Sequence, residues 1–157
     1  MIDTSRYQHS PSCRIQLNTD QIYPNTGVHT LNFDTVIWNE NGCFDFTTQR
    51  WTAQKSGRII VTVAGNFDLS SSTQQLGALH YDFTLFNSSG TLVNSLRFWQ
   101  FNETIPSFYT TSGLGVLAVN VGDYGVFTFL CFHTNARRPG LTPSGGANNH
   151  ASVFYLP

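Results

Sequence analysis

Cys131 and His133 are the first candidates for chemistry, because they lie two residues apart in an apolar segment. In a strand, residues at this spacing project from the same face. Together with Cys43 or His150, such a thiol and imidazole could bind a metal ion. A buried cysteine beside an interface histidine is the more common arrangement, and we favour it here. Cys43 with a distant histidine could also form a nucleophile pair, but we expect Cys43 to pack beside a turn.

The carboxylates point to turns rather than to catalysis. The chain has two glutamates, Glu40 and Glu103, a small pool for the paired acids of glycoside hydrolysis. We expect Asp45 and Asp123 to accept hydrogen bonds from the amides of their own turns. The chain contains no calcium-loop acidic cluster, nucleophile elbow, phosphate-binding loop or His-Glu-x-x-His motif. The sequence therefore predicts no catalytic residue, no metal and no cofactor, and hence a protein that is not an enzyme.

Composition excludes several further classes of function. Charged residues make up 11% of the 157 residues and the net charge is −1, whereas an average soluble domain has about 25% charged residues. Arg137-Arg138 is an isolated basic pair, so we expect no nucleic-acid partner. No apolar stretch is long enough for membrane insertion. The first residues lack a signal-like apolar core, and Met1 looks like a true gene start. The three cysteines, an odd number, are expected to be free and buried.

Alternation of apolar and polar residues with a period of two recurs along the chain and predicts strands. Examples are Cys13–Leu17, Ile59–Val63, Leu79–Leu85 and Leu117–Val121. Turn sequences rich in Asn and Gly separate these runs. We therefore predict one all-β domain, a sandwich over residues 13–157, preceded by an arm of residues 1–12.

The segment Val126–His133 differs because both of its faces are apolar. A strand of this kind has a packing partner on each side. We expect one partner to be the sandwich core and the other to be a neighbouring subunit. The predicted subunit interface consists of Phe127, Phe129, Cys131 and His133.

Three segments are predicted to make contacts outside the domain. Residues 102–112 and 135–149 are rich in Pro, Gly, Ser, Thr or Asn, and long loops in a compact domain are often functional. The arm is the third segment. The candidate contact residues are Arg6, Tyr7 and His9 in the arm, Phe108 and Tyr109 in the first loop, and Arg137, Arg138 and Asn148 in the second.

The order of these motifs resembles a known family. The block from Leu31 to Asp68 contains Phe33-Asp34, then Asn39 and Gly42, then Phe44-Asp45 and Trp51, in that order. Further along, FTLFNSSGTLV, SGLGVLAVNVGDYGVFTF and ASVFYLP are similar to later strands and turns. In this order the motifs resemble the globular head domain of complement component one subcomponent q, in the tumour-necrosis-factor-like superfamily. The chain departs from the family pattern at Gln49-Arg50, where the family usually has Thr-Gly, and at Gly65-Asn66-Phe67. No collagen-like repeat precedes the domain.

The resemblance implies a jelly-roll β-sandwich of two antiparallel sheets that assembles as a homotrimer around a three-fold axis. It also implies a binding or structural role. We expect a bacteriophage virion protein, made in the host cytoplasm and located on the capsid surface. It would act as a decoration or cement protein that clamps the major capsid protein. The alternatives are a receptor-binding fibre tip, perhaps contacting a cell-surface glycan, and a secreted recognition protein of the complement or tumour-necrosis-factor type.

Overall fold

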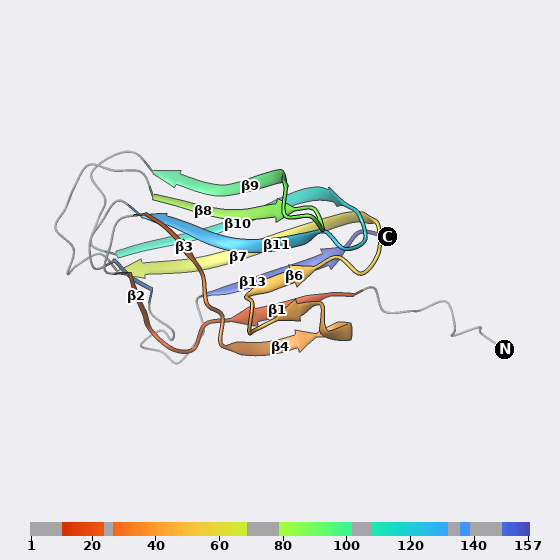
Figure 1. The fold of residues 1–157 in the computed structure, drawn as a ribbon. Helices are drawn as coiled ribbons and strands as arrows, with labels where there is room; N and C mark the ends of the chain where they lie inside the picture. Colours follow the sequence, from red (N-terminus) through yellow and green to blue (C-terminus); the bar gives the residue numbers. More distant parts are fainter. Residues whose placement is uncertain (1–10, 24–26, 69–78, 102–107, 132–135, 139–148) are drawn as a thin grey trace.

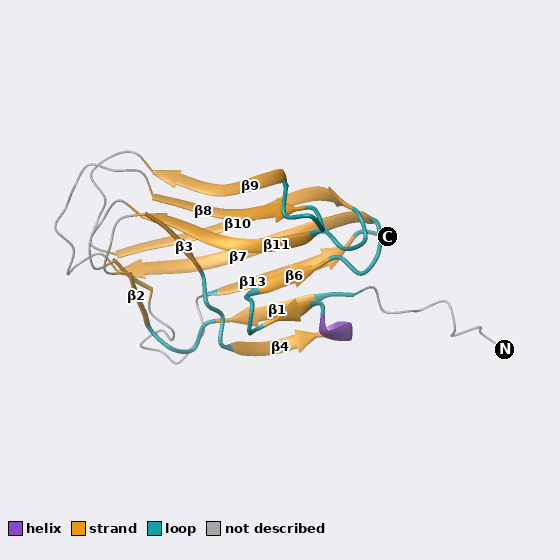
Figure 2. Ribbon diagram, in the orientation of Figure 1, coloured by secondary structure: helices purple, strands orange, loops and turns teal. Residues whose placement is uncertain are grey.

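The computed structural model describes residues 11–23, 27–68, 79–101, 108–131, 136–138 and 149–157. Strands dominate these residues, and the 3₁₀ turn Glu40–Gly42 is the single helical element among them (Figure 2). The strands form two antiparallel sheets, stacked as a sandwich (Figure 1). The predicted all-β jelly-roll fold is confirmed.

The first sheet has seven strands. Its order is β2 (Gln21–Tyr23), β12 (Ala136–Arg138), β7 (Gly57–Asp68), β13 (His150–Tyr155), β1 (Cys13–Gln16) and β4 (Thr35–Asn39). The remaining strand, β10 (Phe108–Val119), pairs with β7 along the full length of both strands. Among the described residues, β2, β4 and β10 each have a neighbouring strand on one side only.

The second sheet has six strands. Its order is β5 (Phe44–Asp45), β6 (Arg50–Thr52), β11 (Tyr124–Cys131), β8 (Leu79–Phe86) and β9 (Leu92–Phe101), and β3 (Gly27–Thr30) also pairs with β11. The chain crosses between the sheets repeatedly, from β7 to β8, from β9 to β10 and from β10 to β11. These crossings bring strands from distant parts of the sequence together.

The core lies between the sheets and consists of the apolar positions that alternation predicted. Ile15, Val61 and Val153 contribute from the seven-stranded sheet, and Phe83 and Phe127 contribute from the six-stranded sheet; all are at most 1% exposed. The rings of Phe83 and Phe127 lie 4.8 Å apart between centroids. Burial of these side chains is the main favourable contribution to folding.

Aspartates hold the turns, as expected from their position. The Asp45 carboxylate accepts hydrogen bonds from the Thr47 amide and the Thr48 hydroxyl, both at 2.8 Å. The Asp123 carboxylate accepts a hydrogen bond from the Asn120 backbone amide at 2.8 Å in the turn between β10 and β11. Gly122 in the same turn has a φ of +86°, which favours glycine. The predicted structural role of both aspartates is confirmed.

The two predicted loops are shorter than expected. Strand β10 begins at Phe108, so residues 108–112 are strand rather than loop, and Tyr109 pairs with Phe67. Arg137 and Arg138 lie in β12, where they pair with Ile22 and Gln21. The turn-forming neighbours Pro106 and Pro139-Gly140 led us to extend both loops over these residues, although Phe, Tyr and Thr at 108–111 favour strands. Residues 102–107 and 139–148, including Asn148, lie outside the described residues.

Candidate binding surfaces

The predicted subunit interface on β11 is wrong for its two phenylalanines. Phe127 is 1% exposed and Phe129 is fully buried within the single chain. Phe127 packs edge-on against Phe33, with 5.5 Å between ring centroids. The sequence showed two apolar faces, and the face that we assigned to a subunit contact is the one that packs in the core. Cys131 ends β11, and His133 lies outside the described residues.

The outer side of the seven-stranded sheet carries an apolar surface instead. Its members are Trp38, Ile60, Leu114, Val116 and Phe154, hereafter the apolar face. Val116 lies opposite Ile60, which in turn lies opposite Phe154. The ring of Phe154 is 5.9 Å from that of Trp38. Leu114 is 66% exposed and Val116 is 47% exposed. A contiguous apolar surface of this kind is typical of a protein interface.

Two glycines in edge strand β10 explain why Leu114 and Val116 of the apolar face project outward. Gly113 and Gly115 point inward, and a Cβ at Gly115 would lie 2.6 Å from Leu96 of β9. The absence of side chains at these two positions lets Leu96 and Phe98 close the core beneath β10. The intervening residues Leu114 and Val116 consequently project outward. A long edge strand with exposed apolar side chains invites pairing or covering.

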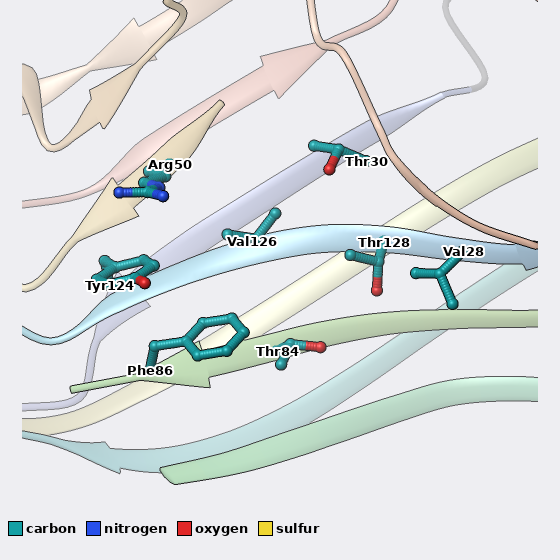
Figure 3. A pocket seen from close by; sticks show the side chains of 8 residues that line it. All are labelled: Val28, Thr30, Arg50, Thr84, Phe86, Tyr124, Val126 and Thr128. Carbon is teal, nitrogen blue, oxygen red and sulfur yellow. The ribbon is translucent and has the colours of Figure 1, made fainter. Parts of the chain in front are cut away.

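A hollow of about 360 Å³ lies on the outer side of the six-stranded sheet (Figure 3). Eight residues line it: Val28, Thr30, Arg50, Thr84, Phe86, Tyr124, Val126 and Thr128. Strands β3, β6, β8 and β11 supply them, and the alternate residues of β11 face the core. We refer to it as the outer hollow.

An aromatic pair and a guanidinium form one end of the outer hollow. Phe86 stacks on Tyr124, with 5.3 Å between centroids and 19° between ring planes. The guanidinium carbon of Arg50 lies 4.4 Å from the centre of the Tyr124 ring. The distance is within the range of a cation–π contact. Sequence reasoning missed all three residues, because their convergence depends on the register between β6, β11 and β8.

Cys13 and Cys43 lie close enough for each to change the pKa of the other. Cys13 and Cys43 are free and buried, as predicted. A hydrogen bond with Cys43 and burial raise the pKa of the Cys13 thiol. Hydrogen bonding from Cys13 lowers the pKa of Cys43. Within the described ranges, no three His, Cys, Asp or Glu side chains gather to hold a metal ion.

The arm residues Arg6, Tyr7 and His9 lie outside the described residues, and their predicted contact is untested. The described residues begin at Pro11, and the hydroxyl of Ser12 donates a hydrogen bond to the Glu40 carboxylate at 3.0 Å.

No helix within the described residues is long and apolar enough to cross a bilayer.

Comparison with known proteins identifies solved structures with a similar fold. Neither protein-family models nor curated protein sequences match this chain. Among solved structures, the globular domain of zebrafish complement 1qA aligns with a TM-score of 0.63 and 15% identity, covering 94% of this chain and 98% of that one.

Two further structures show the same relationship. Murine APRIL at pH 5.0 has a TM-score of 0.61 and 9% identity, with 93% of this chain and 98% of that chain covered. Eiger TNF from S. frugiperda has a TM-score of 0.61 and 11% identity, with 94% of each chain covered. At these identities the likeness concerns the fold. This chain therefore has the jelly-roll fold shared by the complement 1q globular domain and the tumour-necrosis-factor-like proteins.

Proposed function

We propose that this chain is a non-enzymatic, homotrimeric structural protein of a bacteriophage virion, a decoration protein that clamps capsid subunits. The observation that carries the proposal is the apolar face on the seven-stranded sheet. Leu114 and Val116 are exposed on a regular strand, next to Ile60 and Phe154. Such a surface is favourable for a protein only when another surface covers it. We take the covering surface to be a second copy of the chain.

The fold supports three copies rather than two. The resemblance noted above implies assembly around a three-fold axis. In a closed ring of this kind each copy contacts the next through two different surfaces. Among the described residues, the edge of β10 that faces away from β7 and the apolar face of the same sheet offer two such surfaces. This arrangement replaces the interface predicted on β11.

The low charge of the chain fits a structural role on a capsid. Eight basic and nine acidic residues leave a net charge of −1. The carboxylates of Asp34, Asp45 and Asp123 accept hydrogen bonds from nearby chain segments, which supports a structural role for them.

A trimer would place three arms at one capsid site, where three weak contacts act as one strong contact through effective concentration.

The test uses capsids assembled from the major capsid protein encoded nearest to the gene of this chain. We expect the purified trimer to co-sediment with these capsids and to raise their melting temperature. A variant lacking residues 1–10 should remain trimeric but lose binding. That deletion keeps Ser12 and its bond to Glu40, so the folded body is left intact. Failure of the full chain to bind would exclude the capsid role, and unchanged binding of the truncation would exclude the arm as the contact.

A receptor-binding module is the second candidate, and the outer hollow favours it. An open site lined by aromatic, hydroxyl and guanidinium groups is typical of ligand recognition. Binding of the fluorescently labelled trimer to host cells, without binding to capsids, would favour this candidate.

A further inference from the structure

We infer that the outer hollow binds a sugar that carries a carboxylate. This inference goes beyond the proposed capsid role and does not depend on it. It rests on four properties of the hollow: an unused guanidinium, hydroxyl groups, an apolar wall and a limited size.

The Arg50 guanidinium is the cation of the hollow, and its donors are unused among the described residues. It makes the cation–π contact with Tyr124 and no hydrogen bond or ion pair with a described side chain. The guanidinium lies over the Tyr124 ring (Figure 3), and this contact restricts the orientations that the planar group adopts. A guanidinium held in this way presents a fork of N–H donors that matches a carboxylate.

Nearby carboxylates do not neutralise Arg50 directly. Asp45 lies opposite Arg50 in the β5–β6 pair, but its oxygens accept from Thr47 and Thr48. Asp82 accepts from Arg97 Nε at 3.0 Å and Nη2 at 3.1 Å. Neither aspartate lines the hollow. An anionic group on a ligand can therefore pair with Arg50 without displacing an internal ion pair.

The other lining residues select a sugar rather than a simple acid. Thr30, Thr84 and Thr128 lie along the hollow, and each hydroxyl can both donate and accept. Sugar hydroxyls have the same dual capacity. Val126 and the ring of Phe86 provide an apolar wall for the C–H face of a pyranose. A small number of polar groups set in an apolar wall is the usual composition of a small-molecule site.

The size of the hollow limits the ligand. A volume of about 360 Å³ is near the lower end of small-molecule sites, which begin at roughly 300 Å³. One or two sugar rings fit such a space.

The position of the hollow keeps it accessible in a trimer. It lies on the six-stranded sheet, whereas the apolar face lies on the seven-stranded sheet. Self-association through the apolar face would leave three hollows open on the outside. Weak single-site binding would then be strengthened on a surface that displays many copies of the sugar.

The experiment compares methyl β-D-glucuronide with methyl β-D-glucoside, which differ in the carboxylate. Each is titrated into the isotope-labelled protein, and amide chemical shifts are followed by NMR. We expect the glucuronide to shift Val126 and Thr128 with a Kd of about 1 mM. The glucoside should bind at least about tenfold more weakly, because it leaves the Arg50 fork unpaired. Equal affinity for the two sugars would overturn the carboxylate requirement.

Variants locate the effect at the hollow. Arg50→Gln should lose at least about tenfold in glucuronide affinity, and Arg50→Lys should retain part of it. Arg58→Gln is the matched control, because Arg58 is an exposed arginine on β7 of the other sheet. Unchanged glucuronide binding in Arg50→Gln would overturn the proposal.

Two further measurements complete the test. Thr84→Val should weaken sugar binding while the melting temperature stays unchanged. Acetate should bind more weakly than the glucuronide, and acetate binding of equal strength would identify an anion site that does not recognise sugars. Capsid co-sedimentation is measured separately, so failure of sugar binding leaves the capsid proposal intact.

Discussion

Gly125 lies directly beneath the ring of Phe83, so that a Cβ at Gly125 would be 1.9 Å from Phe83 Cζ. The two residues belong to neighbouring strands, β11 and β8, and both face the core. The missing side chain at Gly125 makes room for the Phe83 ring, which packs against Trp51 and Phe127. The aromatic core thus depends on a glycine in the middle of the six-stranded sheet.

Gly125→Ala should therefore destabilise the fold strongly. Overpacking of a well-packed core costs roughly 1–3 kcal/mol and occasionally more, and here the clash involves a fully buried ring. Denaturant unfolding followed by tryptophan fluorescence measures the change. Gly115→Ala is the comparison, because its Cβ would meet the flexible end of the partly buried Leu96. A loss in Gly115→Ala as large as that in Gly125→Ala would contradict this account.

Gln49 occupies a position whose backbone conformation favours glycine, and hydrogen bonds of its side chain compensate for the backbone strain. Its φ is +56°. The side-chain oxygen of Gln49 accepts a hydrogen bond from Phe33 N at 2.8 Å, and its side-chain nitrogen donates to Phe33 O at 3.0 Å and to Phe46 O at 2.8 Å. Gln49→Gly would relieve about 1 kcal/mol of backbone strain but lose three hydrogen bonds worth roughly 0.5–1.5 kcal/mol each.

We expect Gln49→Gly to be destabilised by about 0.5–3.5 kcal/mol in net terms, measured by thermal unfolding. Gln49→Asn tests the same balance, because asparagine tolerates the left-handed conformation but has a shorter side chain. A stabilised Gln49→Gly variant would show that backbone strain outweighs the three bonds.

Leu114→Asp should convert the trimer to monomers without unfolding the chain. Leu114 is 66% exposed, so the substitution removes little from the core, whereas three aspartates would bring charge into the proposed apolar contact. Sedimentation velocity at micromolar concentration gives the assembly state, and circular dichroism checks the fold. Val121→Asp is the control, because Val121 is 64% exposed in the turn between β10 and β11. A wild-type protein that sediments as a monomer would refute the proposed trimer.

Acidification should weaken the fold through His80. Burial and the charge of Arg97 lower the pKa of this imidazole from its ordinary value of 6.5, and the charge of Asp82 opposes them. The unfolded chain therefore binds a proton at a higher pH than the folded chain does. The free energy of unfolding should decrease as the pH falls below 6.5 and level off below the folded pKa.

Unfolding free energies measured from about pH 7.5 to about pH 5.5 test this expectation. In His80→Asn the dependence over this interval should be shallower than in the wild type. An identical slope in the two proteins would assign the pH dependence to other groups.

Much of the fold could be predicted from the sequence, because alternation records which side chains face the core. The inward positions Ile15, Val61, Tyr81 and Phe83 are buried as their spacing indicated. The roles of Asp45 and Asp123 also followed from sequence, since their hydrogen bonds connect residues within one turn. Local interactions of this kind require no knowledge of how distant strands pair.

The surfaces that could bind a partner were decided by tertiary structure. Alternation identified two apolar faces on β11 but could not show that Phe127 and Phe129 face Phe33 and the core. The apolar face needs the register of β10 with β7 and of β7 with β13. Arg50 reaches Tyr124 only because β6 pairs with β11, although the two residues are far apart in the chain. Sequence alone determined the alternation of the two faces along each strand, whereas the pairing of strands decided which face of β11 lies in the core and which outward residues meet.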